Sequence, residues 1–153
     1  MSHSPRCPKC GKAKSKGEDA IKEYLDEHNA DYKAQYSLKN RQKLDFYIRI
    51  GNKRIGLEYQ GIFHYLPRSR GSKKTPRQSL KDNIRRDHTK RLKCKELGIK
   101  LYCIPYWDFH RIEKILDNIL AGKRHRIAPI SKAPAIVISS APLREQLEGE
   151  LGI

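Results

Sequence analysis

The sequence lacks long apolar runs. None of its 153 residues belongs to an unbroken apolar stretch of about 18, the length of a membrane-spanning helix, so we expect no membrane span. The first ten residues, MSHSPRCPKC, lack the apolar core of a secretory signal peptide. Internal repeats are absent as well. These absences favour one domain with a tail in the cytoplasm, either nucleoid-associated or, for a phage-encoded protein, in the host-cell cytosol.

Acidic residues are scarce relative to basic ones. Lys and Arg number 33 against 17 Asp and Glu, which gives a formal net charge of +16. Hydrophobic residues make up 37% of the chain, enough for a folded core in a very polar protein. A basic excess of this size predicts a polyanionic partner, with nucleic acid first and an anionic membrane surface second.

Cysteines are few and unevenly spaced, at Cys7, Cys10, Cys94 and Cys103. Without a secretion signal, this pattern predicts reduced thiols. The C-x-x-C knuckle of Cys7 and Cys10 resembles half of a zinc site, but structural zinc usually takes four ligands as two such pairs. No second pair is present. Zinc at Cys7 and Cys10 is therefore the less favoured interpretation, beside an eroded ribbon or two free thiols.

The most regular pattern lies in residues 43–60, KLDFYIRIGNKRIGLEYQ. Apolar and polar residues alternate on both sides of Gly51-Asn52, which is a two-residue hairpin signal. The pattern predicts two antiparallel strands with Ile50 opposite Lys53. One face is expected to be wholly apolar, formed by Leu44, Phe46, Ile48, Ile55, Leu57 and Tyr59.

The same register places Asp45 opposite Glu58, with Cβ atoms about 5 Å apart, and Gln60 on the same face. A solvated sheet face is one interpretation of this polar group. Like charges directly opposite each other destabilise a sheet, however, and a divalent cation would remove that cost. Mg²⁺ is usually held by one or two carboxylates together with substrate phosphate. We therefore expect Asp45 and Glu58 to hold Mg²⁺ or Mn²⁺ for phosphodiester cleavage.

Other patterns predict elements around this hairpin. A capping box at Ser15 and Glu18 begins a helix that runs to about His28. Ser79 is the expected N-cap of a basic helix with a stripe of Leu80, Ile84, His88 and Leu92. The remaining expected elements are strands at 32–37 and 99–104, a helix at 107–121 closed by Gly122, an edge strand at 136–138 and a short helix at 142–151.

Cations concentrate directly after the hairpin. From Arg68 to Lys100 there are 13 cations and 3 acids, a net charge of +10. The loop and helix could form a solvated surface, or could grip a phosphate backbone. We predict nucleic-acid contacts from Arg68, Arg70, Lys73, Lys74, Arg77, Lys81, Arg85, Arg86 and Lys90.

The order of these motifs resembles the PD-(D/E)xK nuclease superfamily, and most closely the branch near very-short-patch-repair and phage homing endonucleases. The resemblance covers roughly residues 7 to 120. It implies an α/β (α+β) fold with a restriction-endonuclease-like core, a central mixed sheet flanked by helices in the order αβββαβα. The matching positions are Glu18 at the first helix, Asp45 in a DFY strand, residues 58–65, Asp87 and Lys90 as D-x-x-K, and Ile104-Pro105-Tyr106.

Two positions depart from the family pattern. Gln60 stands where the superfamily usually has Lys and this branch often has Asp, and Phe63 stands where Gln is common. Gln cannot titrate or carry charge, so Gln60 can orient a water but cannot act as a base. His64 is the available group for proton transfer, and the alternative is a hydrogen-bonded structural residue. The resemblance gives Glu18 and Asp87 accessory roles, and Asp87 could instead pair with Arg91.

The sequence therefore predicts three segments and one principal function. Residues 1–14 form the cysteine knuckle and residues 15–122 the nuclease-like core. Residues 123–153 form a tail that either docks on the core or on another subunit or is partly disordered. The expected function is a Mg²⁺-dependent DNA endonuclease in homing, repair or restriction. The alternatives are a catalytically inactive nucleic-acid-binding module on the same fold and a zinc-ribbon interaction protein. The oligomeric state, including a homodimer, is left open.

Overall fold

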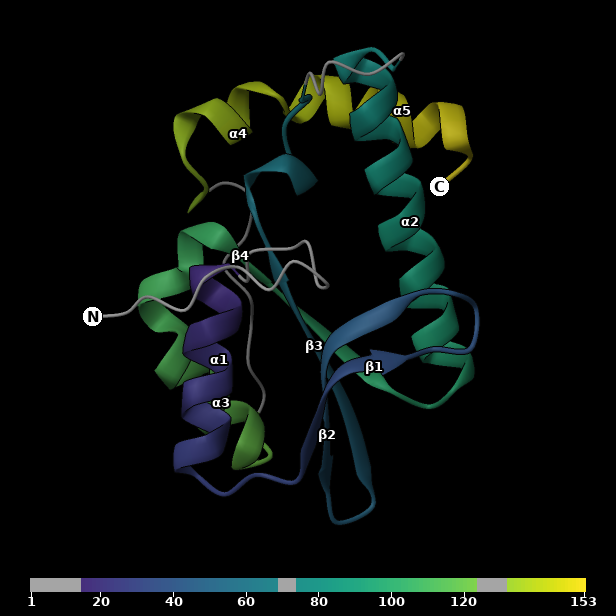
Figure 1. The fold of residues 1–153 in the computed structure, drawn as a ribbon. Helices are drawn as coiled ribbons and strands as arrows, with labels where there is room; N and C mark the ends of the chain where they lie inside the picture. The colour runs from purple at the N-terminus through teal and green to yellow at the C-terminus, as the bar shows by residue number, and fades with distance from the viewer. Residues whose placement is uncertain (1–14, 69–73, 124–131) are drawn as a thin grey trace, which may run out of the picture.

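The structure is a computed structural model that describes residues 15–68, 74–123 and 132–153 (Figure 1). It is a mixed α/β fold in which helices flank a four-stranded mixed sheet of order β1-β2-β3-β4. The elements are α1 (Lys16–Glu27), β1 (Tyr32–Ser37), β2 (Lys43–Ile50), β3 (Lys53–Gln60), η1 (Ile62–His64), α2 (Pro76–Glu96), β4 (Lys100–Pro105), η2 (Tyr106–Arg111), α3 (Ile112–Leu120), α4 (Ala135–Ser139) and α5 (Ala141–Leu151). The predicted order of helices and strands through α3 is confirmed.

The central hairpin has the predicted register. Ile50 pairs with Lys53 and Phe46 with Leu57 across β2 and β3, around a turn in which Gly51 has a φ of 58°. A positive φ at this position is easily adopted by glycine, which explains why the Gly-Asn turn closes the strands. β1 pairs with β2 antiparallel, whereas β3 and β4 run parallel.

One face of the sheet packs against α1 and α3, which lie together on that side (Figure 1). Ser15 caps α1 by accepting a hydrogen bond from the Glu18 backbone, as the capping-box pattern predicted. The main core contains Ile21 and Leu25 of α1, Ile115 and Leu116 of α3, and the buried strand residues Phe46, Ile48, Ile55, Leu57, Tyr102 and Ile104.

The other face lies under α2, and the prediction for this helix was partly wrong. α2 begins at Pro76 with Thr75 as its N-cap, not at Ser79, because Thr-Pro supplies both a capping hydroxyl and a favourable first residue. Leu80 and Ile84 are buried as expected, but Leu92 is 55% exposed. Although α2 has 21 residues, no helix in the described parts of the chain is long and apolar enough to cross a bilayer.

Strand β2 changes its alternation at Asp45. Leu44 was predicted to lie with Phe46, but it packs with Cys94 of α2 and Ile99 in a second cluster. Gln35, the β1 residue next to Asp45, has a φ of 52°, a left-handed conformation that is uncommon for a residue other than glycine. The register pairs resume on either side of it. This irregularity places Leu44 on the α2 side and frees the Asp45 carboxylate to reach β3.

The C-terminal region is helical where a strand was predicted. Residues 136–138 lie in α4 and not in an edge strand, so the β-branched run Ile-Val-Ile was a misleading signal. The predicted helix at 142–151 is confirmed as α5. Its Leu147 is fully buried against Leu80 and Ile84 of α2, so this segment docks on the core (Figure 1). The predicted helix at 107–121 instead opens as the 3-10 segment η2 before α3 begins.

Candidate active site

Asp45 and Glu58 come together on the face of the sheet that α2 covers. Asp45 accepts a hydrogen bond from the backbone N–H of Tyr59 at 2.9 Å, which fixes its carboxylate beside β3. Glu58 is only 7% exposed and Gln60 only 5%. Glu58 and Gln60 are therefore buried and do not form a solvated polar face, whereas Asp45 beside them is partly exposed.

Lys90 is the residue whose position sequence reasoning missed. Its Nζ lies 2.6 Å from Glu58 Oε1, and its side chain is 19% exposed. From the sequence, Lys90 is predicted to contact phosphate together with the other cations of its helix. The available signal was the D-x-x-K spacing, because residues three apart on a helix share a face and Asp87 was already expected near the site.

The protonation of this cluster follows from its burial. Burial, and then the charge of Asp45, raise the pKa of Glu58 to about 8, against the opposing attraction of Lys90. Burial alone would lower the pKa of Lys90, but the carboxylates of Glu58, Asp45 and Asp87 outweigh it, and the net pKa is raised. Glu58 therefore holds its proton more tightly than an ordinary carboxyl does, and Lys90 holds its own more tightly than an ordinary lysine does.

Gln60 and the segment after it form a second part of the site. The amide oxygen of Gln60 accepts a hydrogen bond from the Tyr65 hydroxyl. Burial raises the pKa of that hydroxyl far above its usual range, so Tyr65 remains a donor. Gln60 is thus fixed in orientation on the same sheet face as Glu58.

His64 and Asp87 form a pair between η1 and α2, with His64 Nδ1 3.0 Å from Asp87 Oδ2. Asp87 was predicted either to have an accessory role in the active site or to pair with Arg91. In the structure its partner is His64. Arg144 of α5 donates to the backbone oxygen of His64 at 2.8 Å and lies over the Tyr65 ring. Asn83 donates to the Phe63 oxygen at 3.0 Å. These hydrogen bonds hold η1 against α2 and α5. The contact with Asp87 orients the His64 ring.

Glu18 belongs to α1 and not to the sheet face under α2 that carries Glu58 and Gln60. It sits in the first turn of α1, where its neighbour Gly17 packs directly against the Tyr59 ring. Tyr59 faces the α1 side of the sheet, and Glu58 faces α2. The accessory role predicted for Glu18 remains a prediction.

Several of the predicted nucleic-acid-binding cations are paired with acids. Lys74 lies 2.6 Å from Asp82, and Arg77 and Lys81 both contact Glu150 of α5. Arg85 and Arg86 are exposed on α2, and the Arg68 guanidinium lies 4.5 Å from the Phe63 ring centroid. Arg70, Lys73 and the knuckle residues Cys7 and Cys10 lie outside the described residues. The described part of residues 68–100 is therefore basic, but Asp82 and Glu150 neutralise some of its positive charge.

The raised pKa of Glu58 predicts a specific pH dependence of stability. The folded pKa of about 8 lies above the ordinary value of 4.5, so the folded state binds more protons between these two pH values. The stabilisation that Glu58 gives the folded protein is therefore fully present below pH 4.5 and is lost as the pH rises through 8. In EDTA, the free energy of unfolding of wild type should fall by a few kcal/mol relative to Glu58→Gln across this window.

Denaturant melts of both proteins at pH 5, 7 and 9 measure this difference. A wild-type-minus-variant difference that stays constant across pH would show that Glu58 titrates at an ordinary value in the folded protein.

Comparisons of the chain with protein-family models, with curated proteins and with solved structures find no significant match.

Proposed function

We propose that this protein is a metal-dependent DNA endonuclease with a restriction-endonuclease-like core. The observation that carries the proposal is the cluster of Asp45, Glu58 and Lys90 around the buried Glu58 carboxylate, in which two carboxylates on neighbouring strands meet one lysine from a helix. A cluster of this kind is costly to fold and stabilises little by itself, because burying charges costs more than their attraction usually returns. Strongly perturbed ionisable groups gathered in this way are typical of catalytic sites.

The donor set fits a hard divalent cation held partly by substrate. The described residues contain no group of three or more His, Cys, Asp or Glu placed to hold a metal. Asp45 and Glu58 supply two carboxylates, which is the usual protein share of a Mg²⁺ site whose other ligands are water and phosphate. When bound, such an ion would activate water and offset charge on the phosphate. Mn²⁺ fits the same oxygen donors.

The remaining residues have distinct roles in this proposal. Lys90 supplies the positive charge that Gln60 cannot, beside the carboxylates where a phosphate would lie. Gln60, held by Tyr65, orients the attacking water. His64, whose Nδ1 faces Asp87, is the group that can accept or give a proton through its other ring nitrogen.

Gln60 also supports a second candidate function, a nucleic-acid-binding module that has lost catalysis. The two candidates differ in one measurement. Supercoiled plasmid incubated with the protein should be nicked or linearised with Mg²⁺ or Mn²⁺ and remain intact with EDTA. Branched and mismatched duplexes should be included as substrates. Binding without cleavage under every metal condition would favour the inactive module.

Binding to DNA should depend steeply on salt. If the loop and helix of the +10 segment contact about five phosphates, log K should fall against log[salt] with a slope of about −4 to −5. Replacing Arg68, Lys74 and Arg77 with Ala should flatten this slope by about two to three units, because each lost phosphate contact releases one fewer counterion. Fluorescence anisotropy at several salt concentrations measures the slope.

The matched control replaces three lysines on the α1 and α3 side of the molecule, Lys16, Lys22 and Lys114. It lowers the net charge by the same amount and should leave the slope nearly unchanged. Equal slopes for the two triple variants would show that binding follows total charge and that the +10 segment does not face DNA.

A further inference from the structure

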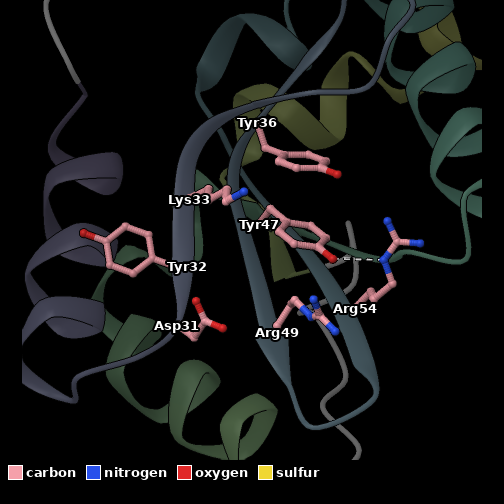
Figure 2. A pocket seen from close by; sticks show the side chains of 7 residues that line it. All are labelled: Asp31, Tyr32, Lys33, Tyr36, Tyr47, Arg49 and Arg54. Carbon is pink, nitrogen blue, oxygen red and sulfur yellow. Dashed lines mark hydrogen bonds between the residues drawn. The ribbon is translucent and has the colours of Figure 1, made fainter.

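The face of the sheet that carries Asp45 and Glu58 continues beyond the end of α2. The helix ends at Glu96, while β2 and β3 extend past it to the turn at Gly51 and Asn52 (Figure 1). There the surface is hollowed by a pocket of about 540 Å³ between β1, β2 and β3 (Figure 2). This volume is within the range of small-molecule sites. The strand rise puts Arg49 in this pocket about 13 Å from Asp45.

Aromatic rings form one side of the pocket. Tyr36 and Tyr47 stack with ring centroids 4.2 Å apart and planes inclined by 14°. Arg54 fastens this stack, because its Nε donates to the Tyr47 hydroxyl at 2.9 Å and its Nη1 donates to the Leu97 oxygen at 2.7 Å. Figure 2 shows the two rings and Arg54 side by side at the pocket. The aromatic side is therefore rigid before any ligand binds.

The charges around the pocket favour an anion. Lys33, Arg49 and Arg54 line it, against the single carboxylate of Asp31. Lys33 and Arg49 are exposed, and neither takes part in an ion pair within the described residues. Arg49 and Arg54 are direct cross-strand partners, and like charges in that position destabilise a sheet. An anion between them would offset this repulsion.

We infer that this pocket binds one nucleotide of a single-stranded nucleic acid. The phosphate lies between Arg49 and Arg54, with Lys33 on the same pocket lining, and the base stacks against the tyrosine side at Tyr36. Stacking surfaces beside a positive groove are the usual means of binding single strands without sequence preference. The inference goes beyond cleavage, because nothing in it requires chemistry at Asp45 and Glu58.

Binding of a fluorescently labelled eight-nucleotide dT strand, measured by anisotropy in EDTA, tests this site without cleavage. Tyr36→Ala should weaken binding by about five- to a hundredfold, the range for losing one stacked base. Tyr36→Phe keeps the ring and should bind like wild type. Arg49→Ala should weaken binding and flatten the salt slope by about one unit. Lys114→Ala removes one charge from α3 and serves as the matched control.

Chemical-shift mapping on the wild-type protein locates the strand without any substitution. Shifts should concentrate at Lys33, Tyr36, Tyr47 and Arg49 on addition of the dT strand, and a single thymidine 5′-phosphate should shift the same residues more weakly. The inference fails if the shifts lie elsewhere, or if Tyr36→Ala with an unchanged melting temperature binds like wild type. It also fails if an abasic strand or a poly-glutamate peptide binds as tightly as dT. Cleavage can persist in each of these cases, so the two proposals fail separately.

Discussion

Asp45→Asn is expected to abolish Mg²⁺-dependent cleavage of plasmid DNA while DNA binding survives or tightens. Asparagine keeps the size of the side chain and removes the charge that would bind the ion. Changing even an outer-shell partner of a metal site typically costs ten- to a hundredfold in activity, so loss of a ligand should cost at least about a hundredfold. Glu58→Gln should behave in the same way. Gln60→Ala should lose less, since an amide that orients water contributes less than a ligand.

The same variant makes a prediction about stability. In EDTA at pH 9, where Glu58 carries its charge, Asp45→Asn should be more stable than wild type by a few tenths of a kcal/mol, because it removes the repulsion between the Asp45 and Glu58 carboxylates. It should also lose most of the rise in melting temperature that Mg²⁺ gives wild type. Metal titrations followed by thermal melting, run beside the cleavage assay, measure both effects. Full cleavage by Asp45→Asn would falsify the assignment of this hairpin as the active site.

Lys90→Met is expected to reduce cleavage by about a hundredfold or more, comparable to losing a preorganised electrostatic donor. It should also destabilise the protein above pH 8 by about 1.4 kcal/mol for each pH unit, because Glu58 without its partner keeps its proton at a pH where the wild-type carboxyl has lost it. Below pH 7 the loss should be much smaller, because Glu58 can keep its proton. Cleavage assays and denaturant melts at pH 6 and pH 9 measure the two effects.

Two further variants separate charge from packing at this site. Lys93→Met changes the neighbouring lysine on α2, which pairs with Glu96 on the surface, and should leave cleavage and stability nearly unchanged. Adding Gln60→Lys to Lys90→Met returns a cation to the same sheet face, so it should recover part of the lost activity. If Lys90→Met cleaves as well as wild type, then the lysine is a structural partner of Glu58 and has no part in the reaction.

The hairpin and its carboxylates could be predicted because their signals are local. The alternation of β2 and β3 and the Gly51-Asn52 turn fix the register as far as the Phe46–Leu57 pair, and Asp45 and Glu58 are the next residues along the two strands. The cap of α1 is equally local, since Ser15 and Glu18 are three residues apart. In each case the residues that decide the structure lie within one element or one turn.

The position of Lys90 could not be read in this way. Its role depends on how α2 lies across the sheet, and many cations on that helix have similar neighbours in sequence. The exposure of Leu92 has the same origin, because the helix packs through Leu80, Ile84 and Cys94 and turns residue 92 outward. For residues 136–138, β-branched composition favoured a strand, yet no sheet edge is paired with them and they form α4. Tertiary contacts decided each of these positions.

The contacts around Glu58 and His64 form in a fixed order as the chain is synthesised. Asp45 and Glu58 belong to one hairpin and meet as soon as it forms, but the contact between Lys90 and Glu58 spans 32 positions, and that between Arg144 and His64 spans 80. During synthesis on the ribosome the N-terminal part emerges first. The nascent hairpin therefore carries its acidic pair before any lysine reaches it, and η1 is fastened only once α5 has left the exit tunnel. A chain interrupted before residue 144 would hold the carboxylates without the arginine that orients His64.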